Sequence, residues 1–337
     1  MKIFFKILII SFLSISSLRA ETFSLLSEYN FFQDIKIQVP NKGVIPYHIA
    51  NPLFSDYTYK FRFVSMPDNS VASYNHEKVF DFPIGATIIK TFAYPVDDRN
   101  LKKGFQLLET RLLIHKKEGW TPVSYVWNEN QTDAKLKFIG KTIEANWIDK
   151  NGNVRNARYR VPNINQCKSC HQLNKAIMPI GPKGRNMDLD FFYQSGKENQ
   201  IDYWEENKLL KDVPKKKMIK PAIWNDETFL IPERARSYLD SNCAHCHRKG
   251  GSAGNSGLYL SLEEVGRMAI GVMKKPVAAG RGSGNMEYVI NPGKPEESIL
   301  LFRMASTDPG VMMPELSRSL SHKEALPVIY EWIKEME

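Results

Sequence analysis

The sequence predicts a multidomain protein in which an N-terminal antiparallel β-sandwich-like domain is followed by a mostly α-helical region. Two observations carry this prediction. Residues 21–160 contain no cysteine and many short stretches of strand character, such as residues 59–63, where aromatic and basic side chains alternate. All four cysteines follow residue 160, where the composition changes and helical periodicity appears. We therefore expect a β-rich domain over 21–160, a middle segment and linker over 161–227, and a C-terminal domain over 228–337.

Short strands separated by turn signals fill the predicted β-rich domain. Residues 143–148 and 154–161 flank Asn151-Gly152, a pair typical of a tight β-hairpin turn. Other strand-like stretches are residues 59–63, 86–92, 107–115 and 123–127. In total we count roughly seven or eight short strands, which is the pattern of an antiparallel sandwich.

The first twenty residues have the organisation of a secretory signal. Lys2 and Lys6 precede an apolar run over 7–18 that is too short to span a bilayer comfortably, and Arg19-Ala20 ends it with a small residue. We expect cleavage after residue 20 and a mature protein in the periplasm, with release outside the cell as the alternative. No second apolar run is long enough to cross a membrane, so no transmembrane segment is expected after cleavage.

The four cysteines form two copies of one pattern. The copies are Cys167-Lys168-Ser169-Cys170-His171 and Cys243-Ala244-His245-Cys246-His247. C-x-x-C-H is the attachment sequence of c-type haem, in which two thiols bind the porphyrin and the histidine ligates iron. The sequence thus predicts two covalently bound haem c groups. A zinc site or two disulfides are the alternatives, but neither requires a histidine directly after each second cysteine.

The charge balance excludes a nucleic-acid-binding surface as the main feature of the chain. The formal net charge is +9, and Lys2, Lys6 and Arg19 of the predicted signal contribute three of these charges. The remaining mildly basic surface suits an acidic redox partner protein, or is an ordinary solvated surface. The sequence does not indicate an oligomeric state.

Helical signals surround the second motif. Residues 233–240 are expected to form a helix that leads into Cys243, and Pro295 suits the first turn of a helix through Met304. An apolar stripe after residue 325 predicts a terminal helix, with Pro327 delaying its start. A terminal helix packed across the helix before the motif is the arrangement of cytochrome c. The mostly α-helical region is therefore expected to be a cytochrome c region.

The motif histidines His171 and His247 are the predicted iron ligands on one side of each haem. For the second haem, Met313 is the preferred sixth ligand, because Pro314 biases it toward an extended backbone. A thioether ligand favours Fe(II) and raises the reduction potential. Met312, or neither methionine, remains the alternative.

The sixth ligand of the first haem is left open by the sequence. Met178, seven residues beyond His171, is the tentative candidate. Other methionines, histidines of the β-rich domain and an open coordination position are alternatives; the residues concerned are Met187, Met218, His48, His76 and His115. His245 lies between the cysteines of its own motif and is expected to point away from iron.

A set of short motifs resembles a family of exported bacterial dihaem c-type cytochromes with an N-terminal β-rich domain and a poorly defined function. The matching stretches are Pro46-Tyr47, 51–57, 82–85, 90–92, 109–112, 125–128, 167–171 and 180–182. Separately, Asn291-Pro292-Gly293, Glu297-Ser298 and Met313-Pro314 resemble class I cytochrome c domains, which supports Met313 as a ligand. The resemblance implies a periplasmic haem protein and brings no established substrate.

These observations favour electron transfer to or from a redox partner over catalysis. The alternative is a dihaem enzyme, a peroxidase or an oxidase of small substrates, that uses the first haem as its reactive site. A third interpretation makes the β-rich domain a docking module, which is compatible with electron transfer.

Overall fold

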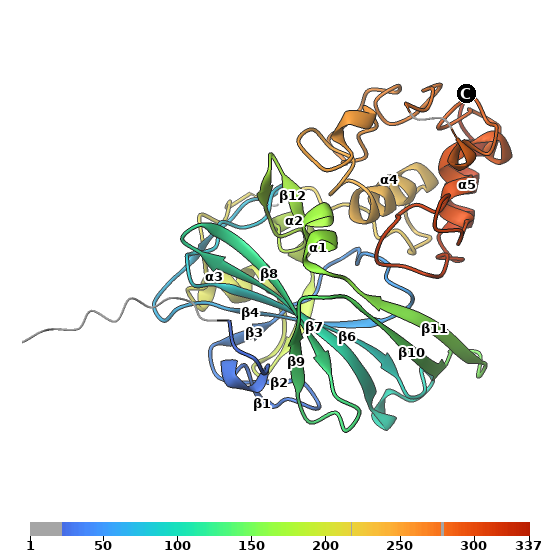
Figure 1. The fold of residues 1–337 in the computed structure, drawn as a ribbon. Helices are drawn as coiled ribbons and strands as arrows, with labels where there is room; N and C mark the ends of the chain where they lie inside the picture. The colour runs from blue at the N-terminus through green and yellow to red at the C-terminus, as the bar shows by residue number, and fades with distance from the viewer. Residues whose placement is uncertain (1–21, 217, 278–279) are drawn as a thin grey trace, which may run out of the picture.

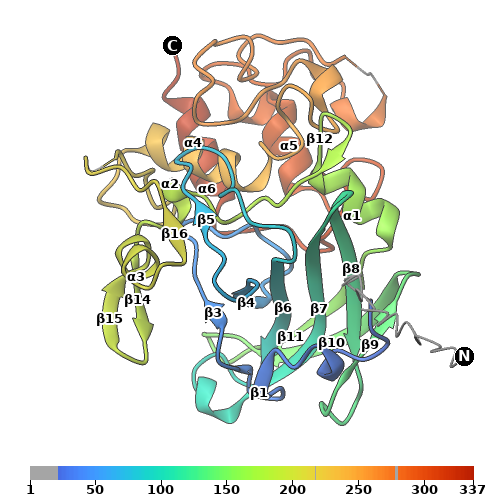
Figure 2. The same ribbon diagram turned by 90° about the vertical axis from the view of Figure 1, so that its left-hand side faces the viewer.

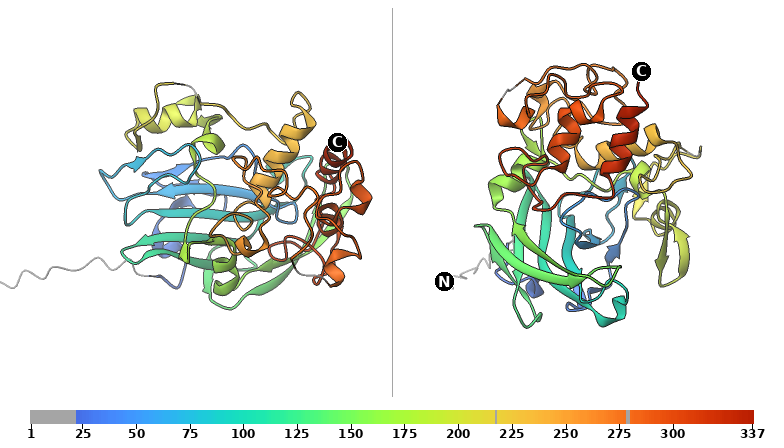
Figure 3. Two further views of the ribbon diagram at one scale, coloured as in Figure 1. Left: turned by 90° about the horizontal axis from the view of Figure 1, so that it is seen from above. Right: turned by 90° about the vertical axis from the view of Figure 1, so that its right-hand side faces the viewer.

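A computed structural model describes residues 22–216, 218–277 and 280–337 of the chain. The predicted signal, residues 1–20, lies outside the described residues. The chain folds into a β-sheet part and a C-terminal part that lies against one face of the sheet at its upper end in Figure 1. Figure 3 shows the same two parts from two further directions.

A six-stranded antiparallel sheet is the centre of the fold, and its strands follow the order β3-β4-β6-β7-β8-β9 (Figure 2). The strands are β3 (Val44–Pro46), β4 (Tyr59–Ser65), β6 (Thr87–Pro95), β7 (Phe105–Lys116), β8 (Gly119–Trp127) and β9 (Ala134–Lys137). Most of the β-branched and aromatic residues that predicted these strands are buried, as expected for a sheet covered on both faces; Tyr59 and Phe61 of β4 are half-buried. The prediction of an antiparallel β-rich N-terminal domain is confirmed.

The two faces of this sheet are covered differently. One face packs on the N-terminal residues, where Leu26, Phe31 and Phe32 contact side chains such as Ile89 and Tyr125. A single-turn 3-10 helix (Ser27–Tyr29) and the short strands β1 (Phe32–Asp34) and β2 (Val39–Pro40) belong to this layer. The opposite face carries the functional groups described below.

The hairpin of β10 (Lys141–Ile148) and β11 (Val154–Val161) covers one end of that opposite face. Ile148 pairs with Val154 across the Asn151-Gly152 turn, which confirms the predicted hairpin. Trp147 stacks on Tyr94 of β6, with ring centroids 4.2 Å apart. The sandwich-like layer is thus only two strands wide.

The segment after the first motif covers the other end of the same face. Its Trp204 is fully buried among Phe80, Tyr47 and Met187. The elements at this end of the sheet are short. β5 (Ala72–Ser73) comes from the chain between β4 and β6, and the segment after the first motif provides β12 (Gln172–Leu173), β13 (Ala176–Ile177), α2 (Gly184–Met187), β14 (Asp190–Tyr193), β15 (Gly196–Asn199), α3 (Gln200–Glu206) and β16 (Leu210–Lys211). Between the two covered ends, the middle of the sheet faces the C-terminal part.

The C-terminal part contains three α-helices around a common apolar cluster. Its elements are α4 (Ile231–Asn242), a 3-10 turn at Gly254–Ser256, a 3-10 turn at Arg281–Ser283, a 3-10 turn at Pro295–Glu297, α5 (Ile299–Ala305) and α6 (Leu326–Lys334). Leu239 of α4 and Ile329 of α6 lie in the same buried cluster, so the predicted packing of the terminal helix across the helix before the motif is confirmed. Pro327 occupies the first turn of α6, where its missing N–H costs no helical hydrogen bond.

The prediction of a mostly α-helical cytochrome c region is wrong. The described residues are mostly β, with 28% in strands and 20% in helices, which are six in number and short. The described residues between α4 and α5 form turns and single-turn 3-10 helices, because this stretch is rich in glycine and glycine disfavours helix. A search of the described residues for a membrane-spanning helix finds none of sufficient length and apolarity.

Residues 51–57 lie in the chain between β3 and β4 and form hydrogen bonds with the C-terminal part. We call them the connecting segment. The amide of Asn51 bonds the backbone of Ala222 and Trp224, and Asn242 accepts a hydrogen bond from the Phe54 N–H at 2.7 Å. The buried carboxylate of Asp56 accepts hydrogen bonds from the N–H and hydroxyl of Ser319 and the N–H of Leu320, all at 2.8 Å. These bonds fix how the two parts of the chain face each other.

We predict that Asp56→Asn lowers the free energy of unfolding by about 1–3 kcal/mol, because the new amide directs a donor at N–H groups that have lost an acceptor. Asparagine tolerates the left-handed backbone at this position, where φ is 49°, so the backbone adds little. Asp68→Asn at an exposed loop position is the matched control and should change stability by less than about 0.5 kcal/mol. Chemical denaturation measures both, and equal stabilities for the two variants would contradict the role given to Asp56.

Candidate functional site

The first motif lies on α1 (Ile164–His171), an eight-residue helix that ends at His171. Asn163 caps its first turn: its side chain accepts the Gln166 N–H, and Gln166 in turn accepts the Asn163 N–H. This capping box stabilises the first turn of α1, which is shorter than the length at which isolated helices are stable in water. Cys167 and His171 are thereby presented on one short, fixed helical turn.

The second motif follows directly after α4. Cys243 continues the helical hydrogen bonding by donating its N–H to Leu239, and the N–H groups of Cys246 and His247 both bond the Cys243 carbonyl. The motif is thus one tight turn attached to a twelve-residue helix. Cys243 and His247 are buried, at 8% and 9% exposure.

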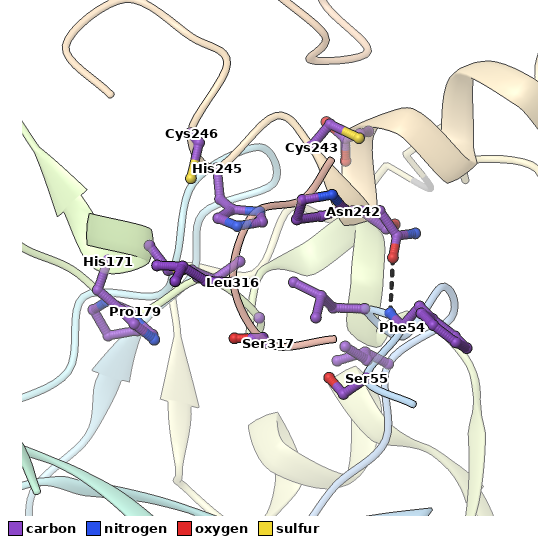
Figure 4. Close-up of a pocket in the computed structure, with 18 of the residues that line it drawn as sticks. Phe54, Ser55, His171, Pro179, Asn242, Cys243, His245, Cys246, Leu316 and Ser317 are labelled. Carbon is purple, nitrogen blue, oxygen red and sulfur yellow. Dashed lines mark hydrogen bonds between the residues drawn. The ribbon is translucent and has the colours of Figure 1, made fainter. Parts of the chain in front are cut away.

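Residues of both motifs line one cavity of about 550 Å³ between the sheet and the C-terminal part; among the four cysteines, Cys170, Cys243 and Cys246 belong to its lining and Cys167 does not. Its walls are the first motif, the second motif, the middle of strands β4, β6 and β7, the connecting segment, and residues 313–318. Figure 4 shows His171 and Pro179 on one side of this space, with His245 and Cys246 beside them. Asn242 and Cys243 lie across it, and Leu316 and Ser317 lie between.

The backbone of Met178 orients the ring of His171. The His171 Nδ1 lies 2.8 Å from the Met178 carbonyl oxygen, so Nδ1 carries the hydrogen and Nε2 is left as the free lone pair. Burial lowers the pKa of His171 to about 4, so the imidazole is neutral at pH 7. A neutral imidazole with a fixed tautomer is the form that ligates iron.

The second motif has a comparable but looser arrangement. The His247 Nδ1 lies 3.4 Å from the Ser256 hydroxyl, and burial also lowers the pKa of this imidazole. Met313 lines the same cavity, and its backbone is fixed by hydrogen bonds with Arg303 and Arg318. Met312 is buried away from the cavity lining. The structure therefore brings Met313 to the cavity that His247 lines.

The structure does not bring Met178 to the cavity. Its side chain packs with the apolar cluster around Trp204, and only its backbone reaches the first motif. The other candidates lie elsewhere too. Met187 is fully buried in that cluster, Met218 is exposed, His48 packs on Phe191, His76 bonds Tyr74, and His115 stacks on Trp120.

His245 is a cavity residue whose position in the lining the sequence does not predict. It is 7% exposed, it lines the cavity, and its Nδ1 has no hydrogen-bond partner among the described residues. One ring nitrogen lies within 4.8 Å of the sulfur atoms of both Cys170 and Cys246. No local signal predicts this position, because it depends on how a motif 76 residues earlier in the chain packs against this one.

The residues around the cavity fit haem. All four cysteines are described and none is in a disulfide, so each thiol is free for a thioether. The cavity volume lies within the ~300–1,000 Å³ range of cofactor pockets. Two buried guanidinium nitrogens of its lining, Arg62 Nη2 and Arg318 Nε, have no partner within the described chain, and such orphaned donors suit an anionic group.

An ion-pair network holds the two sides of the cavity together near the second motif. Arg185 of α2 donates hydrogen bonds to Asp240 of α4, at 2.7 Å, and to Glu263. The side chains of Arg185 and Asp240 are buried, and that of Glu263 is exposed. Lys183 reaches the Asp240 carboxylate at 3.5 Å, and burial lowers the pKa of this lysine to about 8. Lys275 and Arg281 of the glycine-rich stretch pair with Glu287 and Asp308 on the surface, away from the cavity.

Comparison of the chain with protein-family models, with curated proteins and with solved structures finds no match.

The facing motifs predict a specific cross-link in the haem-free chain. Because the Cys170 and Cys246 sulfur atoms lie within 4.8 Å of each other, diamide should oxidise these two thiols to one disulfide, with loss of two protons and two electrons to the reagent. Peptide mapping by mass spectrometry identifies the linked peptides. Disulfides confined to each motif, Cys167 to Cys170 and Cys243 to Cys246, would contradict the facing arrangement.

Proposed function

We propose that this protein is a periplasmic dihaem c-type cytochrome that exchanges electrons with a redox partner protein. The observation that carries the proposal is that residues of both C-x-x-C-H motifs, which use every cysteine of the chain, line one cavity. The fixed Nε2 of His171 and the presence of Met313 in the same lining add to it. The resemblance to exported dihaem cytochromes is consistent with this role.

In this proposal each motif holds one haem. Cys167 and Cys170 attach the first and Cys243 and Cys246 the second, with His171 and His247 as iron ligands. Met313 is the proposed sixth ligand of the second haem. When bound, haem supplies an iron that cycles between Fe(II) and Fe(III), one electron at a time. The chain orients the histidines and encloses the groups between the sheet and the C-terminal part.

A zinc site is the weaker interpretation of the same residues. Cys170, His245 and Cys246 offer three ligand atoms within 4.8 Å of one another, and a structural zinc takes four. Zinc bound there would leave Cys167, Cys243 and both motif histidines without a role. Haem gives each of these residues a function, so the cofactor proposal is haem.

A dihaem enzyme is the second candidate, and one observation favours it. Among the described residues that line the cavity, Met313 is the one methionine, while Met178 is turned into the apolar cluster. A first haem that lacks both a methionine and a second histidine as ligand has an open sixth position, which peroxide or oxygen chemistry needs. Carbon monoxide binding and peroxide turnover separate the two functions. Two low-spin haems that react with neither reagent would support electron transfer and exclude the enzyme. A high-spin haem that turns over peroxide would identify the protein as an enzyme.

We predict two haems per chain. The full-length chain, exported in a bacterium that attaches c-type haem, should give a pyridine haemochrome of two haems per protein and a haem-stained band after denaturing electrophoresis. Cys167→Ser/Cys170→Ser and Cys243→Ser/Cys246→Ser should each reduce the count to one. A haem-free protein that carries zinc by elemental analysis would contradict the proposal.

We predict that Met313→Ala converts one low-spin haem to high spin and shifts the potential of that haem negative, because the thioether that favours Fe(II) is lost. Met312→Ala is the matched control, since Met312 is the neighbouring residue but lies outside the cavity lining. Electron paramagnetic resonance and visible spectra measure the spin state. Spectra of Met313→Ala that match the wild type would refute the assignment.

A further inference from the structure

Three basic residues form a row across the middle of the sheet. Arg62 of β4 pairs directly with Lys90 of β6, and Lys90 pairs directly with Arg111 of β7. Directly paired residues of neighbouring strands project on the same face, so three cationic side chains stand side by side. All three line the cavity. We call Arg62, Lys90 and Arg111 the cation row.

The cation row is energetically unfavourable as it stands. Like charges directly opposite each other on a sheet repel, and removal from water weakens the screening of that repulsion: Arg62 is buried, and Lys90 and Arg111 are half-buried. Burial, together with the charges of Arg62, Lys60 and Arg111, lowers the pKa of Lys90 well below its usual value. On one side of the cation row the neighbouring residues are apolar, with Val64 paired with Ile88; on the other side Phe92 lies between Lys60 and Glu109.

The described side chains neutralise only one member of the cation row. Arg111 pairs with Glu109, a buried carboxylate that also accepts the Tyr159 hydroxyl at 2.9 Å. Arg62 is 7% exposed; its Nη1 bonds the Lys60 carbonyl, and its Nη2 has no partner within the described residues. For Lys90 the described chain offers no carboxylate within ion-pair distance, and its ammonium lies 4.9 Å from the centre of the Phe92 ring. A ring face attracts a cation but carries no net charge.

The acidic residues of the cavity lining are committed to other partners. Asp240 is bonded to Arg185, and Glu315 lies 3.7 Å from Arg303. On the basic side, Arg318 adds a further buried guanidinium whose three hydrogen bonds all go to carbonyl oxygens and whose Nε has no partner in the described part of the chain. The cavity therefore presents more positive charge than its own residues neutralise.

We propose that the cation row is a binding site for carboxylate groups inside the cavity, and that the propionates of an attached haem are its ligand. The identity of that ligand rests on the proposed function; the presence of a carboxylate site does not. A guanidinium presents two parallel N–H donors that match the two oxygens of a carboxylate. Neighbouring strands lie about 4.8 Å apart, so the cation row extends over about 10 Å and accommodates a ligand with two carboxylates.

This proposal gives the β-rich domain a direct part in the site. The cysteines and histidines that attach haem all lie after residue 160, whereas the cation row lies on strands β4, β6 and β7. Positive charge beside a haem stabilises Fe(II) relative to Fe(III), because the oxidised group carries one more positive charge. The sheet would then set the reduction potential of the haem whose propionates it binds.

The test uses the exported full-length chain, with haem content first measured by pyridine haemochrome. Lys90→Met and Arg62→Met remove one charge each, and Arg62→Lys retains the charge. Lys135→Met on β9 is the matched control, an exposed lysine of the same sheet outside the cavity lining. Removing one of three repelling charges should not prevent folding, which thermal unfolding checks. Spectroelectrochemistry gives the midpoint potentials, and redox-difference infrared spectra give the carboxylate bands.

We expect Lys90→Met and Arg62→Met to shift one midpoint potential negative and to move carboxylate bands, while Lys135→Met stays close to the wild type in both. Arg62→Lys should leave the midpoint potential close to the wild type, because it retains the charge, but should still move carboxylate bands, because it removes the paired N–H donors. Succinate added at constant ionic strength should then have no effect on the wild type, because the propionates occupy the cation row. A saturable effect of succinate that Lys90→Met abolishes would instead assign the carboxylate site to a diffusible anion. Unchanged carboxylate bands in every variant, together with no response to succinate, would overturn the proposal.

Failure of haem attachment is a separate outcome. A haem-free chain contradicts the proposed function, and the cation row is then tested directly by thermal unfolding with succinate. A carboxylate site predicts that succinate raises the melting temperature of the wild type more than that of Lys90→Met. Equal responses of the two proteins would overturn the carboxylate site as well.

Discussion

The buried carboxylate of Asp56 is the interaction on which the rest of this structure depends. It accepts hydrogen bonds from residues that lie more than 260 positions later in the chain, and it does so from a connecting segment that also bonds Ala222, Trp224 and Asn242. These hydrogen bonds fix the orientation of the C-terminal part relative to the sheet. The cavity, the facing of the two motifs and the position of Met313 all follow from that orientation.

Local patterns predicted the local structure well. Alternation and β-branching identified β4, β6, β7 and β8 of the sheet but not the short strands β3 and β9. Asn151-Gly152 identified the separate hairpin of β10 and β11, because turn chemistry acts over a few residues. The helix before Cys243 and the terminal helix were predicted for the same reason. The helical content of the C-terminal part was overestimated. Its glycine-rich stretch follows no regular period, and the likeness to cytochrome c suggested more helix than these residues form.

Of the candidate site, the sequence predicted the residues but not their arrangement. The two motifs were identified from spacing alone, and Met313 was selected for its place before Pro314. Met178 was chosen for its closeness to His171 in the chain, yet the structure uses its carbonyl and buries its side chain elsewhere. His245 was set aside because of its position inside a motif. The cation row was invisible to the sequence, since its three members lie on three strands and meet only through the register of the sheet.

The shared cavity has a consequence for how the protein is made. Cys167 and Cys243 are almost entirely buried. Under the proposed function, an attachment enzyme and a large planar group need access to each pair of thiols, so attachment would precede the closing of the sheet against the C-terminal part. Maturation would then follow an order: export, attachment on an open chain, and last the docking that Asp56 secures between distant parts of the sequence. The supply of haem would then limit how much loaded protein accumulates.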